Sequence, residues 1–229
     1  MALWVVFPNI GFIHVLLKRN MKLQEITKLD DFFTSCCFKA MTSIQCGLKR
    51  MANEDGNIDE QNYMMGLAGM IGVEIGPTDY LLGGELRKQI TSSNKAVQDL
   101  IARLRKSNDG YKLNVTVKPD YVIHYSVKRD VLSEETQKLV IEAKTTNNLD
   151  QDAFCWDLYK LMSYVNELSF QTAVYIILNS DKKRIDTLLT GYKRQGLPVI
   201  NVPIGRLLFF IQENIDSMPK AYSLDCSVD

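Results

Sequence analysis

The sequence lacks the features that identify several classes of protein. Its formal net charge is zero, because 27 Lys and Arg residues balance 27 Asp and Glu residues. A chain without a basic excess has no global field for non-specific binding to nucleic acid, so any site for a polyanion has to be local. Only two histidines are present, His14 and His124, which excludes a zinc site built from several histidines.

The cysteines do not form the framework of a disulfide-rich protein. They are odd in number and contain no C-x-x-C pair: Cys36, Cys37, Cys46, Cys155 and Cys226. No spacing pairs one of them with a histidine as a catalytic nucleophile would require. We therefore predict a reducing intracellular compartment, either cytoplasm or nucleus.

A long apolar run opens the sequence, MALWVVFPNIGFIHVLL (1–17). No positive charge precedes it, and Pro8, Gly11 and His14 interrupt it. It is also shorter than the about 20 residues that a bilayer span requires. We expect a buried strand and turn here and no association with a membrane, with a cleaved leader as the alternative.

What is present favours one α/β domain. The 229 residues, of which 46% are apolar, suffice for one substantial core. We predict an N-terminal, mostly helical extension at 1–78 packed on a core at 79–229. Apolar periodicity in the core predicts helices or strands in this order: helical 79–106 with a break at 91–94, strands 111–117, 120–127 and 138–144, helix 151–168, strand 172–179, helix 181–194, strand 197–202 and helix 205–216. This order predicts a central mixed β-sheet flanked by helices.

Charged residues stand at the ends of two predicted strands, where apolar residues are expected. Asp120 opens one strand, while Glu142 and Lys144 close another. Side chains alternate along a strand, so Glu142 and Lys144 share a face, and Asp120 joins them if the two strands are neighbours. Two carboxylates suit Mg²⁺, and an adjacent lysine can orient or help to deprotonate a metal-activated water.

These residues carry a resemblance to a known family. Pro119-Asp120 followed by Glu142-Ala143-Lys144 resembles the motif of the PD-(D/E)XK nuclease superfamily, also called restriction-endonuclease-like. The elements from about 95 to 179 are similar to its αβββαβ core. The resemblance implies that Asp120, Glu142 and Lys144 are catalytic and that Asp120 and Glu142 bind Mg²⁺ or Mn²⁺. The alternative is that Asp120 caps a turn and that Glu142 and Lys144 end a strand at the surface.

The same resemblance implies additional site residues. The family usually adds an acidic metal ligand from its first helix, for which Glu85 is our candidate, with Asp99 and Glu74 as alternatives. Some branches carry Q-x-x-x-Y on the helix after the third strand. Here Lys160 and Tyr164 occupy those positions, with Lys where Gln is expected.

These helix residues are our candidates for substrate binding. We expect Lys160 to meet a phosphate and Tyr164 a sugar or base, both facing away from the sheet. Gln151, at the start of the same helix, is a third candidate for substrate binding.

The implied function is hydrolysis of phosphodiester bonds by a metal-dependent nuclease. Its partner would be nucleic acid, DNA rather than RNA, and a homodimer is an open alternative because many such nucleases dimerise. Basic groups at 103–106, 182–184 and 193–194 are candidates for substrate contact, although each also suits a solvated helix face. The rival hypothesis is a catalytically inactive binding or effector module on the same scaffold.

Overall fold

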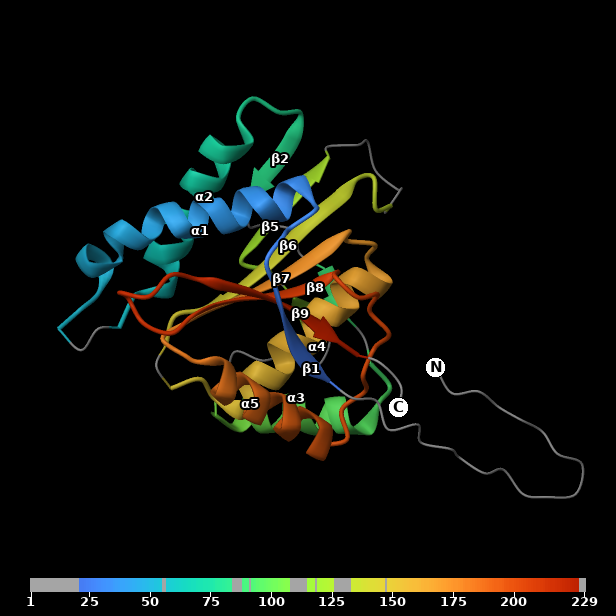
Figure 1. Cartoon of the computed structure of the whole chain (residues 1–229). Coiled ribbons are helices and arrows are strands. Elements are labelled where there is room, and N and C mark those ends of the chain that lie inside the picture. Colours follow the sequence, from blue (N-terminus) through green and yellow to red (C-terminus); the bar gives the residue numbers. More distant parts are fainter. Residues whose placement is uncertain are drawn as a thin grey trace, which may run out of the picture.

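The protein is an α/β fold, seen in a computed structural model that describes residues 21–54, 57–83, 88–90, 92–107, 115–117, 119–125, 133–146 and 148–226. A seven-stranded mixed sheet forms its centre, with helices on both faces (Figure 1). The predicted class, a central mixed sheet flanked by helices, is therefore confirmed. The apolar run at 1–17 lies outside the described residues.

The order of strands in the main sheet is β1-β9-β8-β7-β6-β5-β2. Their bounds are β1 Lys22–Ile26, β2 Tyr80–Gly83, β5 Tyr121–Tyr125, β6 Gln137–Lys144, β7 Thr172–Leu178, β8 Leu207–Gln212 and β9 Lys220–Asp225. Strands β6, β7 and β8 pair in parallel, whereas the other neighbours pair antiparallel. Strands β3 (Lys88–Ile90) and β4 (Val115–Val117) form a separate pair. Every residue of β7 and β8 is buried, as expected for parallel strands covered on both faces.

Two hydrophobic clusters fill the two sides of the sheet. Helices α1 (Phe32–Met51) and α2 (Glu60–Ile75) cover one face, and α4 (Gln151–Glu167) covers the other (Figure 1). Helices α3 (Lys95–Ser107) and α5 (Lys182–Arg194) also contact α4. Helix α4 is therefore an inner layer, buried between the sheet and other helices.

Several predicted elements are wrong. The segment at 79–90, predicted helical, forms β2 and β3 in its described parts, and 197–202, predicted as a strand, has no regular secondary structure. The predicted last helix at 205–216 is instead strand β8, which pairs with the unforeseen β9. The run LLFFI is apolar throughout, so its sequence has no periodicity that would distinguish a buried strand from a buried helix. Its secondary structure is therefore determined by its place in the sheet.

The described residues before 79 belong to the same core as the rest. Strand β1 pairs with β9 at one edge of the sheet, and α1 and α2 share a hydrophobic cluster with β5, β6, β7 and β8. The five cysteines, all within the described ranges, form no disulfide bond with one another. Within the described ranges, no helix has the length and apolar character needed to cross a membrane.

Candidate active site at the end of strand β6

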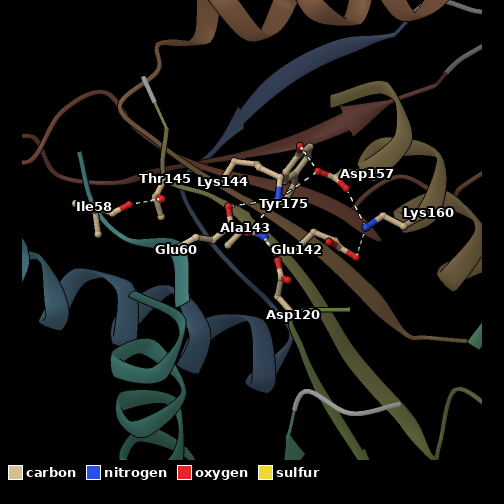
Figure 2. A network of polar contacts seen from close by, with 10 residues as sticks. All are labelled: Ile58, Glu60, Asp120, Glu142, Ala143, Lys144, Thr145, Asp157, Lys160 and Tyr175. Atoms are coloured by element: carbon tan, nitrogen blue, oxygen red, sulfur yellow. Dashed lines mark hydrogen bonds and ion pairs between the residues drawn. The ribbon is translucent and has the colours of Figure 1, made fainter. Parts of the chain in front are cut away.

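The predicted catalytic residues meet where β5 begins and β6 ends. The antiparallel register sets Tyr121 opposite Ile141, which brings Asp120, the residue before β5, beside Glu142. Oδ2 of Asp120 accepts a hydrogen bond of 2.8 Å from the backbone N–H of Ala143. Glu142 and Lys144 both form ion pairs with side chains of α4, so they share the face of the sheet that α4 covers (Figure 2).

Two carboxylates that the sequence analysis did not single out join this group. Nζ of Lys144 lies 3.1 Å from Oε1 of Glu60 and 3.6 Å from Oδ2 of Asp157. Glu60 is the first residue of α2, and Asp157 lies on α4. Lys144 therefore connects two helices that cover opposite faces of the sheet.

The start of α2 is held against the end of β6. The hydroxyl of Thr145 donates a hydrogen bond of 2.6 Å to the carbonyl of Ile58, two residues before Glu60. The carbonyl of Thr145 accepts a hydrogen bond of 3.0 Å from the side-chain amide of Asn179, just beyond β7. These bonds fix the backbone around Lys144, so its contact with Glu60 is built into the fold.

Lys160 lies inside the site. Its Nζ is 2.9 Å from Oε1 of Glu142 and 2.9 Å from Oδ1 of Asp157, and the three side chains are only 9%, 2% and 7% exposed. The hydroxyl of Tyr175 donates a hydrogen bond of 3.1 Å to the other oxygen of Asp157 (Figure 2). The expectation that Lys160 faces outward is wrong, since its side chain points toward the sheet and pairs with Glu142 of β6. A buried lysine is stable there because carboxylates balance its charge.

Tyr164 also points inward rather than away from the sheet. It is fully buried and packs edge-on against Phe170, with ring centroids 6.1 Å apart. Its hydroxyl is buried without a hydrogen-bond partner. The outward orientation predicted for Tyr164 is therefore wrong as well, and its role in substrate binding stays a prediction.

The remaining candidates lie elsewhere or outside the described part of the chain. The amide of Gln151 donates hydrogen bonds to the carbonyl of Leu188 (2.9 Å) and to Sγ of Cys155 (3.1 Å), which ties α4 to α5. Asp99 pairs with Lys95 on α3. Glu85 lies outside the described residues. A role for Gln151 in substrate binding and a role for Glu85 as a metal ligand both stay predictions.

The site contains more carboxylates than cations. Glu60, Asp120, Glu142 and Asp157 lie around Lys144 and Lys160, a formal excess of two negative charges when all are ionised. Burial raises the pKa of Glu142 to about 8, although Lys160 attracts the ionised form. Burial likewise raises the pKa of Glu60, with Lys144 opposing it. The two lysines thus neutralise the carboxylates only in part.

For Asp157 and Lys144, unlike Glu142 and Glu60, nearby opposite charges together affect the pKa more than burial does. Burial acts to raise the pKa of Asp157, but Lys160 and Lys144 outweigh it and the pKa lies below its ordinary value. Burial acts to lower the pKa of Lys144, but Asp157 and Glu60 outweigh it and the pKa lies above its ordinary value. Lys144 therefore keeps its proton at neutral pH.

The donor atoms suit a hard divalent cation, although they do not yet converge on one point. Carboxylate oxygens are the ligands that Mg²⁺ and Mn²⁺ prefer. Oε1 of Glu142 is buried and its charged contact is the ion pair of 2.9 Å with Nζ of Lys160. In the described part of the chain, no three His, Cys, Asp or Glu side chains are arranged to hold an ion.

Comparisons with protein-family models, with curated proteins and with solved structures find no match to the chain.

Proposed function

We propose that the protein is a divalent-metal-dependent nuclease that hydrolyses phosphodiester bonds in nucleic acid, with DNA favoured over RNA. The observation that carries the proposal is the meeting of Asp120, Glu142 and Lys144 on one face at the end of β6. That placement agrees with the resemblance of these residues to the PD-(D/E)XK motif. A single charged residue at a strand end has a simple surface explanation, whereas three on one face beside further buried carboxylates do not.

Asp120 and Glu142 are the proposed ligands of Mg²⁺ or Mn²⁺, and Glu60, held beside the site by its ion pair with Lys144, is the candidate for a third carboxylate ligand. When bound, such an ion activates a water molecule and stabilises negative charge on a phosphate. Because Lys144 keeps its proton, it acts as a hydrogen-bond donor and a positive charge rather than as a base. Its proposed role is to orient the attacking water and to stabilise charge that develops on the phosphate.

The start of α5 is the proposed contact for the nucleic-acid backbone. Parallel strands β6 and β7 end at the same edge of the sheet, and the bond from Asn179 to Thr145 joins their ends. The basic residues 182–184 follow directly, and Arg184 donates to the carbonyl of Leu149 in the loop after β6. Lys183 is exposed at this edge, where ligands commonly bind in α/β sheets.

The proposal is tested by a cleavage panel. Labelled DNA and RNA, linear and circular, are incubated with Mg²⁺, Mn²⁺ or EDTA, using the parent protein and Glu142→Gln. We expect cleavage that depends on the metal and is lost in the variant. Cleavage that persists in EDTA or in Glu142→Gln would point to a contaminating nuclease and count against the assignment.

A catalytically inactive binding module is the second candidate, because Lys160 already forms ion pairs with both Glu142 and Asp157. A site that satisfies its carboxylates internally has less need of a metal. Calorimetric titration of Mg²⁺ into the parent and into Asp120→Ala separates the two candidates. Heat of binding in the parent that is absent from the variant supports the nuclease, whereas no binding in the parent supports the inactive module.

A further inference from the structure

We propose that Lys160 is a built-in cation of the metal site, so that the protein binds one divalent ion and Lys160 excludes a second ion from the position between Glu142 and Asp157. The inference rests on the proposed function, because it concerns the number of ions that the same site accepts.

The position of the ammonium group is that of a bridging cation. Nζ of Lys160 is equally close, at 2.9 Å, to one oxygen of Glu142 and one oxygen of Asp157. Both carboxylates are almost fully buried, and the second oxygen of Asp157 already accepts from Tyr175. Buried carboxylates require a cation or a proton. Without the lysine charge, this pair would offer facing oxygens to a metal ion.

The charge of the site agrees with a single ion. When all four carboxylates are ionised, they exceed the two lysines by two charges, which one divalent cation balances. Removing the charge of Lys160 raises the excess to three, which favours a second cation in the space that Lys160 leaves. The number of ions bound should therefore depend on this one side chain.

Lys160 is also more deeply buried than Lys144. It comes from the middle of α4, which packs against the sheet and contacts α3 and α5, and its side chain is 9% exposed. The side chain of Lys144 is 21% exposed and lies between Glu60 and Asp157. The charge of Lys160 is therefore enclosed with its two carboxylates, whereas the ammonium group of Lys144 is partly open to solvent.

The test counts bound ions. Mn²⁺ is titrated into the parent protein, and free Mn²⁺ is followed by electron paramagnetic resonance, a readout that needs no activity. We expect one ion per chain for the parent and two for Lys160→Gln. The double variant Lys160→Gln with Asp157→Asn should return to one, because the second position loses a ligand. Lys138→Gln, at the other end of β6, is the matched control and should bind one.

Two further variants keep the test decisive if Lys160→Gln does not fold. Lys160→Arg retains the charge and should bind one ion. Asp157→Asn alone should also bind one, because Asp157 is not a ligand while Lys160 is in place. Two ions in Lys160→Arg, or none in Asp157→Asn, would overturn the inference.

The possible failures of the two proposals are distinguishable. One ion in both the parent and Lys160→Gln, at equal affinity, overturns the role of Lys160 and leaves the nuclease proposal intact. No ion in the parent overturns both proposals, and one ion in Lys160→Gln would then favour the inactive module. Two ions in the parent, or none in any variant, overturn the inference.

Discussion

Asp120 is tied through Oδ2 to the backbone N–H of Ala143, the residue between Glu142 and Lys144. A side chain here takes the place of a main-chain acceptor in the ladder, so the carboxylate is fixed at the end of β6. Its position is set by the backbone and not by the ion it is proposed to bind. Oδ1 of Asp120 is then held where it can serve as a ligand without a large loss of side-chain entropy.

Replacing Lys144 should separate metal binding from catalysis. Lys144→Ala should bind Mg²⁺ nearly as well as the parent but cleave about 10²-fold more slowly or worse, since it removes a donor needed mainly in the transition state. Asp120→Ala should lose both binding and cleavage, because a ligand is gone. Calorimetry and single-turnover cleavage measure the two properties. Lys138→Ala on the same strand serves as control, and cleavage by Lys144→Ala at the parental rate would refute the role given to Lys144.

Metal affinity should rise with pH. The pKa of Glu142 is raised to about 8, so below that pH the ion has to displace a proton from this carboxyl. The apparent affinity for Mg²⁺ should therefore increase by up to about tenfold per pH unit between pH 6 and 8 and level off above. Calorimetry at pH 6, 7, 8 and 9 provides the measurement. An affinity that does not change from pH 6 to 8 would show that Glu142 is already ionised or is not a ligand.

The first described helices should unfold together with the sheet. Ile71 of α2 is fully buried in the cluster shared with β5 to β8, so Ile71→Ala should lower the free energy of unfolding of the whole chain by about 2–5 kcal/mol. Val73→Ala, at a position 72% exposed on the same helix, should change it by less than about 0.5 kcal/mol. Urea unfolding followed by circular dichroism and tryptophan fluorescence measures both. An early separate transition in Ile71→Ala, with the remainder unfolding as in the parent, would contradict a shared core.

Substrate affinity should depend on a lysine beside the carboxyl ends of β6 and β7, and not on a lysine elsewhere on the sheet. Lys183, at the start of α5, should contact a phosphate, so Lys183→Ala should weaken binding of labelled DNA and reduce the slope of log affinity against log salt by about one. Lys22 lies on the edge strand β1, in register with Asp225 of β9. Lys22→Ala is the matched control and should not change the affinity. Fluorescence anisotropy with Ca²⁺ in place of Mg²⁺ measures both. Equal effects of the two variants would argue for diffuse rather than local binding.

The meeting of Asp120 with Glu142 could be predicted from the sequence because two local rules suffice. Strand alternation gives Glu142 and Lys144 a common face, and the short interval from β5 to β6 favours antiparallel neighbours. Glu60 could not be found this way, because five described elements, β2, β3, α3, β4 and β5, separate α2 from β6 in the sequence. The one local signal was Asp59-Glu60 at the start of an apolar helix, which predicts a cap and says nothing about Lys144.

The orientation of α4 could not be predicted for a different reason. The sequence predicted that Lys160 and Tyr164 face away from the sheet. Twelve of the 17 residues of α4 are in fact buried, because the sheet, α3 and α5 all contact it. A helix enclosed on two sides has no solvent face to define its direction. The side of α4 that faces the sheet carries Lys160, which pairs with Glu142 of β6. The sequence of the helix alone does not identify this partner.

The pairing of β1 with β9 has a consequence for synthesis on the ribosome. Gln24 and Asp225, which share a hydrogen bond across these strands, are 201 positions apart in the sequence. A nascent chain therefore carries Leu23, which is buried in the finished fold, without its partner strand until β9 has emerged. Contacts of such long sequence separation slow folding, and the unpaired edge is a surface for aggregation during that interval. Translation speed and chaperone access in the interval between the synthesis of β1 and that of β9 should thus influence how much of this protein reaches its native state.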